Sequence, residues 1–318
     1  MPLLELRDLH IHFGATPAVD GVSLSLEEGR TLCLVGESGC GKSITALSIG
    51  RLLLMPPAHY PRGEILVDGR DVLRLRSRQL QSLRGGTVGY VFQEPGASLN
   101  PVLRVGTQIR EALELHRPDS ATEAEVLRLL RLVGIPAPES RIRDYPHQLS
   151  GGMAQRVMIA MGLASQPRLL VADEPTTALD VTVQAQIIEL LQRLQGELGM
   201  AILLITHNLG LVTDIGDRVA VMYAGRIVEE GPATEILTRP RHPYTRALLR
   251  SVPELGRSSD RLAAIPGTVP SLGQWPAGCR FAPRCPEARP ECGQRMPELK
   301  EISPGRTVRC PFSQDSEP

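Results

Sequence analysis

Apolar runs alternate with amphipathic segments along most of this chain. Four segments have strand patterns, and they cover residues 3–13, 87–92, 169–172 and 200–205. The last two are continuous apolar runs, as in buried strands. Residues 63–69 form a shorter strand pattern that ends in an Asp-Gly turn signal. Helical patterns follow at residues 44–54 and 181–198. Strands alternating with helices in this way predict an α/β fold with a largely buried sheet.

Two regions depart from that alternation. From about residue 96 to 165, apolar side chains such as Leu113, Val126 and Leu130 recur at helical spacing, which predicts an inserted helical subdomain. After residue 252 the regular pattern fades, and prolines and glycines become frequent. We therefore expect a core domain over residues 1–252 and a small, loop-rich extension over residues 253–318.

A glycine-rich octapeptide lies between the apolar run 32–35 and the helical run from residue 44. It has the pattern Gly, four variable residues, then Gly-Lys-Ser. Glycines allow successive backbone N–H groups to converge on a phosphate at the positive end of the following helix. The residues expected to bind phosphate are Gly36, Ser38, Gly39, Cys40, Gly41, Lys42 and Ser43. Lys42 would reach the β- and γ-phosphates and Ser43 would ligate Mg²⁺, so the chain is predicted to bind ATP or GTP.

Two further motifs narrow the class of nucleotide-binding protein. The apolar run 169–172 leads directly into Asp173, placed to act on Mg²⁺, and Glu174, placed to polarise an attacking water as a general base. About twenty residues earlier, Ser150, Gly151 and Gly152 expose backbone N–H groups at a predicted helix start, which is a second phosphate-binding device. If the two devices serve one nucleotide in trans, each from a different subunit, two subunits must pack head to tail.

Composition limits the partners and the location. The 35 basic and 35 acidic residues balance, so no overall field favours nucleic acid, and we expect no nucleic-acid partner. Apolar stretches stay below the roughly 18 residues that span a bilayer. The N-terminus lacks the charged and apolar pattern of a secretory signal. A cytosolic protein whose membrane contact runs through a partner is expected.

Taken together, these motifs resemble the ATP-binding subunit of an ABC transporter. The resemblance implies that Phe13 stacks on adenine, that Gln93 contacts Mg²⁺ and faces the membrane subunits, and that His207 contacts the γ-phosphate. Residues 178–180 resemble the loop that crosses between subunits. One departure concerns Met153, where the family usually has Gln. Because Ser150, Gly151 and Gly152 carry the phosphate contacts, function is expected to survive that change.

Several stretches are similar to one branch, the ATP-binding subunits of dipeptide and oligopeptide importers, with nickel importers as close relatives. The stretches cover residues 93–101, 242–249, 265–270 and 279–286. The branch implies a subunit that hydrolyses ATP to drive peptide import from the cytoplasmic face of the membrane. The implied partners are two transmembrane permease subunits, a second ABC ATPase that is identical or paralogous, and an extracytoplasmic peptide-binding protein. Import of nickel or another small solute is the alternative.

Four cysteines, Cys279, Cys285, Cys292 and Cys310, lie in the extension. Disulfides are disfavoured in a reducing cytosol. Zinc is an alternative, although the intervening gaps of five, six and seventeen residues lack its usual paired spacing. Four thiolates suit a [4Fe–4S] cluster, and the importer branch implies one there. Four unligated thiols in a poorly packed tail are the remaining interpretation.

Two other function classes compete with a transporter subunit. The neutral net charge does not favour a soluble ABC ATPase that acts on nucleic acid or ribosomes. Proteins of that class usually carry long coiled coils or two ATPase cassettes in one chain. An iron–sulfur sensor that merely binds ATP would not need Glu174 and His207. Turnover is therefore expected.

Overall fold

The computed structural model describes residues 1–251 and 265–313. The chain divides into two compact units. One unit contains Met1, Leu26–Arg30 and Arg74–Ile205. The other contains Pro2–Ser25, Thr31–Leu73 and the described residues from Thr206 onward. The predicted domain boundary after residue 252 lies outside the described residues, and the bounds predicted for the helical subdomain stay a prediction.

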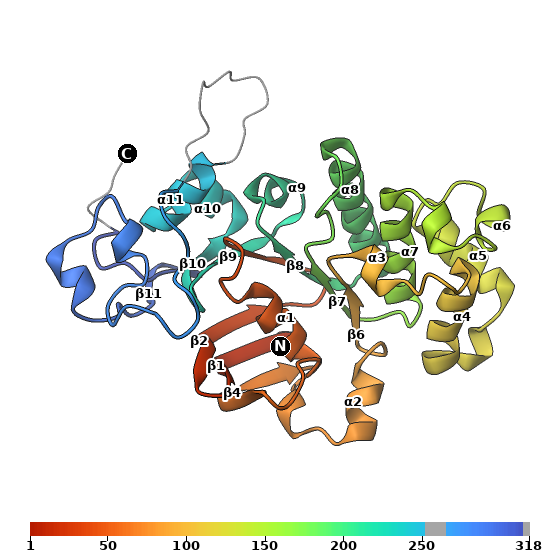
Figure 1. Ribbon diagram of the computed structural model, residues 1–318, viewed down its shortest axis with the longest axis horizontal. Helices are drawn as coiled ribbons and strands as arrows, with labels where there is room; N and C mark the ends of the chain where they lie inside the picture. The colour runs from red at the N-terminus through yellow and green to blue at the C-terminus, as the bar shows by residue number, and fades with distance from the viewer. Residues whose placement is uncertain (252–264, 314–318) are drawn as a thin grey trace. The chain divides into compact units, whose positions relative to one another are not determined.

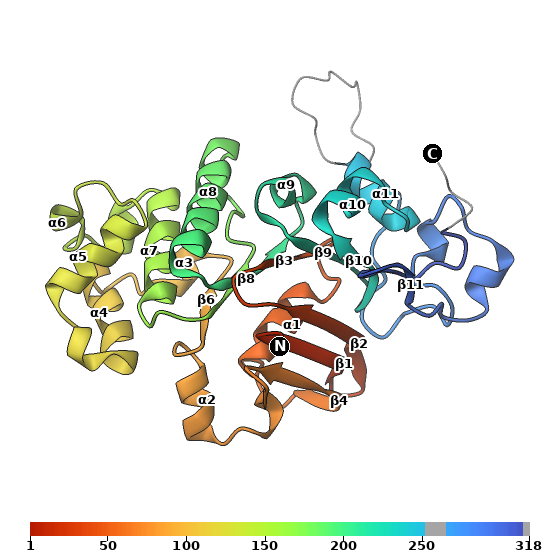
Figure 2. The same ribbon diagram turned by 180° about the vertical axis from the view of Figure 1, so that it is seen from behind.

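The second unit contains a sheet in the order β2-β1-β4-β5, in which β4 is antiparallel to both of its neighbours. The ribbon views show β2, β1 and β4 in that order (Figures 1 and 2). Strand β1 (Leu4–Phe13) confirms the strand predicted from residue 3. Strand β2 (Thr16–Leu26) was not predicted, although buried and exposed side chains alternate over its last five residues. Strand β4 (Ala58–Val67) is longer than its sequence pattern suggested, and it pairs with β5 (Arg70–Asp71). The Asp-Gly turn between them has positive φ at both residues, as a tight hairpin requires.

The same unit also contains the ladder β11-β12-β10-β9-β3. Strand β3 (Thr31–Val35) is parallel to β9 (Arg218–Tyr223), and the other neighbours are antiparallel. Strands β11 (Lys300–Ser303) and β12 (Arg306–Val308) extend the ladder beyond β10 (Arg226–Pro232). The C-terminal extension is therefore joined to its unit by backbone pairing.

Short helices accompany these strands. Helix α1 (Lys42–Ile49) ends at Gly50, so the helix predicted as far as residue 54 is shorter than expected. The remaining helical elements of this unit are η4 (Leu209–Leu211), α9 (Val212–Ile215), α10 (Ala233–Thr238), α11 (Pro243–Arg250), η5 (Ala282–Arg284) and η6 (Pro290–Gly293).

The first unit is built on three parallel strands in the order β8-β7-β6. Strands β7 (Leu169–Asp173) and β8 (Ala201–Thr206) are buried along their whole length, which explains their continuous apolar sequences. Strand β6 is Val88–Val91. Helix α8 spans Val181–Leu198, which are the bounds that the sequence predicted.

Helices occupy most of the chain between β6 and β7. They are α3 (Pro95–Ser98), α4 (Val105–His116), η2 (Pro118–Ser120), α5 (Glu123–Leu132), α6 (Pro138–Arg141), η3 (Pro146–Gln148) and α7 (Gly151–Leu163). Helices α4, α5 and α7 pack against one another, as both ribbon views show (Figures 1 and 2). Before β6 lie η1 (Val72–Arg74) and α2 (Ser77–Leu83). Within the described residues, no helix combines the length and apolar character needed to cross a membrane.

Candidate nucleotide-binding site

The glycine-rich octapeptide, residues 36–43, follows the buried strand β3 and leads into α1; it is called the phosphate loop below. Gly36, Gly39 and Gly41 all have positive φ, at 156°, 78° and 109°. A Cβ on Gly36 would lie 2.2 Å from the carbonyl oxygen of Met222, and one on Gly41 would lie 3.1 Å from the carbonyl oxygen of Ala18. Glycine is therefore required by the backbone packing as well as by the approach of a phosphate.

The side chain of Lys42 folds back onto the phosphate loop. The residue is only 4% exposed, and its Nζ donates to the carbonyl oxygens of Gly36 at 2.8 Å and Glu37 at 3.0 Å. Ser43 follows it in the first turn of α1. Cys40 is buried within the loop, and this burial raises the pKa of its thiol, so the thiol is neutral and packs as a small apolar group.

Two residues that sequence reasoning did not single out contact this loop. The Tyr244 hydroxyl accepts the backbone N–H of Glu37 at 2.8 Å, and the Arg284 guanidinium binds the Glu37 carboxylate. Both residues lie in stretches whose only signal was their resemblance to importers. No local pattern could reveal these contacts, because they join residues more than 200 positions apart.

Phe13 and His207 lie in the same unit as the loop. Phe13 ends β1 opposite Ala58 and is half-buried. His207 is exposed and directly follows β8. The next residue, Asn208, donates its backbone N–H to the Thr206 hydroxyl and caps η4.

The acidic pair belongs to the other unit, at the end of β7. Asp173 is 7% exposed and Glu174 is 9% exposed. The Glu174 Oε2 accepts hydrogen bonds from the Thr177 hydroxyl at 2.7 Å and from the Gln93 Nε2 at 3.3 Å. Glu174 also has a positive φ of 46°, a conformation that costs a non-glycine residue free energy. The structure thus brings together Gln93 and Glu174, two predicted site residues.

The Ser-Gly-Gly motif forms the N-terminus of α7. The Ser150 hydroxyl caps this helix by accepting the backbone N–H of Met153 at 3.3 Å. A Cβ on Gly152 would lie 2.8 Å from the Cγ1 of Val183 in α8. Asp180 caps α8 in the same manner. The start of α7 therefore packs closely against the first turn of α8, which is why a glycine is needed there.

The predicted Mg²⁺ donors are divided between the units: Ser43 belongs to one, while Gln93 and Asp173 belong to the other. Their hydroxyl, amide and carboxylate oxygens are donors of the hard type that Mg²⁺ prefers. The assembly of one complete ATP site from these parts stays a prediction.

The four cysteines of the extension line one cavity of about 20 Å³, together with Phe281 and other side chains. All four are free of disulfides, and the backbone N–H of Cys279 donates to the carbonyl oxygen of Cys292 at 2.7 Å. Burial raises the pKa of the Cys285 thiol to about 11, so without a metal ligand it is neutral. Among residues 1–251 and 265–313, no group of three or more His, Cys, Asp or Glu could hold a metal ion. The predicted [4Fe–4S] cluster and its zinc alternative are therefore not supported by this arrangement.

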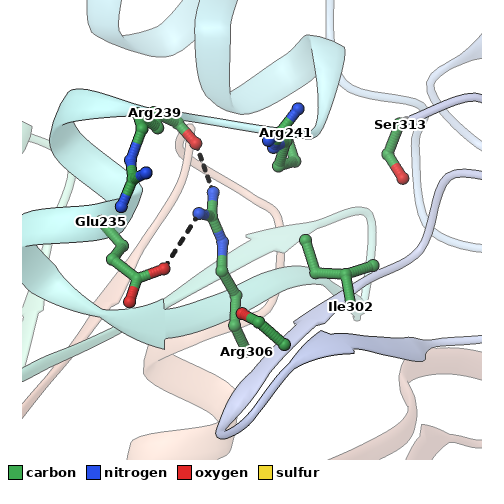
Figure 3. A pocket seen from close by; sticks show the side chains of 7 residues that line it. Glu235, Arg239, Arg241, Ile302, Arg306 and Ser313 are labelled. Atoms are coloured by element: carbon green, nitrogen blue, oxygen red, sulfur yellow. Dashed lines mark hydrogen bonds and ion pairs between the residues drawn. The ribbon is translucent and has the colours of Figure 1, made fainter. Parts of the chain in front are cut away.

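A second pocket, of about 450 Å³, lies where β11 and β12 meet α10 (Figure 3). Arg306 reaches across it to the Glu235 carboxylate at 3.2 Å and to the carbonyl oxygen of Arg239 (Figure 3). Arg306 also donates to the fully buried Glu229 at 2.9 Å. These ion pairs fasten the extension to its unit.

Comparisons with known proteins agree with these motifs. A family model described as ABC transporter matches residues 19–177, and a model described as the oligopeptide/dipeptide transporter C-terminal region matches residues 228–292. The chain is 51% identical over 315 residues to a probable peptide ABC transporter ATP-binding protein of Sinorhizobium fredii, covering 97% of this chain and 94% of that protein. It is 49% identical to the oligopeptide transport ATP-binding protein OppD of Bacillus subtilis, covering 96% and 88% of the two chains. It is also 49% identical to the dipeptide transport ATP-binding protein DppD of Haemophilus influenzae, covering 100% and 98%.

Two solved structures of ABC transporter proteins have a similar fold. Clostridium perfringens cbiO1, part of the ABC transporter complex cbiONQ, gives a TM-score of 0.66 at 28% identity, covering 75% of this chain and 91% of that one. The ATP-binding cassette MJ0796, solved as a dimer in a post-hydrolysis state with ADP and phosphate, gives 0.63 at 28% identity, covering 72% and 98%. The fold is thus that of an ABC ATPase, with an α/β core and mixed sheets. This chain belongs to the ATP-hydrolysing subunits of ABC transporters, in the branch of the oligopeptide and dipeptide transporters.

Proposed function

We propose that this subunit hydrolyses ATP to drive the import of dipeptides or oligopeptides through partner membrane subunits. The observation that carries the peptide assignment is the match of residues 228–292 to the transporter C-terminal region, on a chain with all the ATPase motifs in order. Relatives named for peptide, oligopeptide and dipeptide transport support it. Import of nickel or another small solute by the same machinery is the less favoured alternative.

Each motif residue has a role in the proposed reaction. Phe13 would stack on adenine, and Lys42 would exchange the loop carbonyls of Gly36 and Glu37 for the β- and γ-phosphates. Glu174 would accept a proton from the attacking water, and His207 would contact the γ-phosphate. Ser43, Gln93 and Asp173 would hold Mg²⁺, which when bound neutralises charge on the phosphates.

The signature motif is proposed to act across a dimer. Ser150, Gly151 and Gly152 would bind the γ-phosphate of a nucleotide held by a second ATPase subunit, identical or paralogous. Closure of the pair would then be transmitted through the segment after Gln93 to two permease subunits, at the cytoplasmic face of the membrane. A separate extracytoplasmic protein would deliver the peptide. The dimeric solved cassette supports the pairing.

A pulldown tests this assignment. Tagged Glu174→Gln chain is isolated from native membranes in mild detergent with ATP and Mg²⁺, so that blocked hydrolysis holds the closed complex together. Two polytopic membrane proteins and a second ATPase, identified by mass spectrometry, are expected. Recovery of a soluble complex containing nucleic acid or ribosomes, with no membrane protein, would overturn the transporter assignment.

A [4Fe–4S] cluster at the four cysteines is a narrower proposal. It is motivated by the type of donor and by the family resemblance, not by a formed metal site: four thiols line one cavity, and each ligand of such a cluster binds a different iron. The cavity between the cysteines is too small for a [4Fe–4S] cluster, because its volume of about 20 Å³ holds about one water molecule. The loops that carry the cysteines would have to separate. Strictly anaerobic purification should yield about four irons and four sulfides per chain, and their absence would reject the cluster.

A further inference from the structure

Arg284 joins the C-terminal extension directly to the phosphate loop. It ends the η5 turn, and its Nη1 and Nη2 donate to Oε2 and Oε1 of Glu37 at 2.8 and 2.9 Å. The pair has the two-pronged geometry of the strongest Arg–carboxylate contacts. Glu37 is the second residue of the phosphate loop, and sequence patterns leave that position variable.

The guanidinium is held on its other sides as well. Its Nε donates to the carbonyl oxygen of Pro266 at 2.8 Å, and its Nη1 donates to the Tyr223 hydroxyl at 3.3 Å. The Arg284 side chain is only 5% exposed. An exposed ion pair contributes little because solvent and side-chain motion compete with it. Here burial and the additional acceptors fix the guanidinium in one orientation.

Glu37 in turn contacts the lysine that is proposed to bind the nucleotide. Its carbonyl oxygen accepts from the Lys42 Nζ at 3.0 Å, and its N–H donates to the Tyr244 hydroxyl. The Tyr244 ring packs on Tyr223 and Phe281, with ring centroids 4.6 and 5.3 Å apart. The side chain, the N–H and the carbonyl oxygen of one loop residue are therefore all fixed, two of them by groups outside the loop.

We propose that Arg284 is a positioning residue for ATP binding: by holding Glu37, it keeps the phosphate loop in the conformation that receives the phosphates. The proposal rests on the ATPase function and goes beyond it. Arg284 lies outside residues 19–177, which match the ABC transporter model, and inside residues 228–292, which match the transporter C-terminal region. The C-terminal extension then contributes a residue that positions the phosphate loop for ATP.

The test compares full-length variants by ATP titration calorimetry and by steady-state ATPase assays. Arg284→Ala should raise the ATP Kd and KM by about tenfold, the effect of losing a charge-assisted hydrogen bond, while kcat changes less than about twofold. Arg284→Lys should recover only part of the affinity, because an ammonium cannot bind both carboxylate oxygens. Glu37→Gln should raise KM in the same way, and the double variant Arg284→Ala/Glu37→Gln should be no worse than Arg284→Ala alone.

Arg246→Ala is the matched control. Arg246 binds Glu287 of the extension through two oxygens at 2.5 and 2.6 Å, but this pair is not part of the phosphate loop. Its loss should leave the ATP KM unchanged. Equal KM increases in Arg246→Ala and Arg284→Ala would overturn the proposal, as would additive effects of Arg284→Ala and Glu37→Gln. If Arg284→Ala does not fold, the milder variant Glu37→Gln tests the proposal alone. An ATP Kd of Glu37→Gln equal to that of wild type would then reject it.

ATP binding by the wild-type chain separates a failure of the proposed function from a failure of the role of Arg284. If wild-type chain binds no ATP, the proposed function itself is wrong. If wild-type chain binds ATP and Arg284→Ala binds it equally well, only the role of Arg284 is wrong.

Discussion

The side-chain amide of Gln93 donates to the carboxylate of Glu174, across 81 positions of sequence and at 3.3 Å. The same carboxylate oxygen accepts the Thr177 hydroxyl at 2.7 Å. Two donors converging on one oxygen fix the orientation of the proposed general base. The orientation of this carboxylate therefore depends on the position of Gln93.

Glu174→Gln should bind ATP with near-normal affinity but hydrolyse it about 10²- to 10⁴-fold more slowly, because an amide cannot accept the proton of the attacking water. The measurement is single-turnover hydrolysis beside ATP titration. Glu189→Gln, an exposed change in α8 of the same unit, should keep normal turnover. Turnover near wild type in Glu174→Gln would reject Glu174 as the base.

Ser150→Ala should lower ATP hydrolysis at least about tenfold, since its hydroxyl is proposed to bind the γ-phosphate of the partner's nucleotide. It also caps α7, so stability should fall by about 1 kcal/mol. Thr122→Ala is the matched control, because Thr122 caps α5 with a hydrogen bond of the same 3.3 Å length. Equal losses of activity in both variants, measured beside thermal melts, would mean that Ser150 acts through stability alone.

Gly36→Ala should destabilise the chain by about 1–3 kcal/mol and weaken ATP binding, because the new Cβ would collide with the Met222 carbonyl oxygen. Denaturant unfolding and ATP titration measure the two effects. Gly96→Ala is the control, since a Cβ at that position would meet no atom within 4 Å. Normal stability in Gly36→Ala would contradict the described loop packing.

Asp20→Asn should cost about 3 kcal/mol of stability, because Asp20 accepts hydrogen bonds from Arg226 and Arg280 in a partly buried site. Burial alone would raise the Asp20 pKa, but the two arginines outweigh it and hold the pKa below its ordinary value of 3.8. A lowered folded pKa stabilises the protein above about pH 4, and this contribution is lost as the pH falls through the folded pKa.

The difference in unfolding free energy between wild type and Asp20→Asn should therefore be larger at pH 7 than at pH 3, as measured by denaturant titration. Glu5→Gln, which breaks an exposed ion pair with Arg7, should change little at either pH. A pH-independent difference for Asp20→Asn would contradict the assigned ion pairs.

Local sequence was sufficient wherever one segment carries its own signal. Helix α8 has an Asp180 cap, an amphipathic body and a terminal Gly199 in the left-handed region, so both of its ends were predictable. The short continuous apolar runs of β7 and β8 favour buried strands, and the structure confirms them. The phosphate loop, Asp173 and Glu174 were recognisable because their chemistry requires residues adjacent in sequence.

The sequence by itself thus determined the family, the nucleotide motifs and the elements with a strong local pattern, among them β1, β7, β8 and α8. It did not predict β2, β9 or β10. Tertiary structure alone decided the hydrogen bond from Gln93 to Glu174, the gathering of four cysteines around one cavity, and the ion pair of Arg284 with Glu37. It also decided the pairing of β12 with β10, which joins the extension to its unit. The physical reason is range: helix caps and loop glycines act over a few residues, whereas these contacts form only when distant segments fold together.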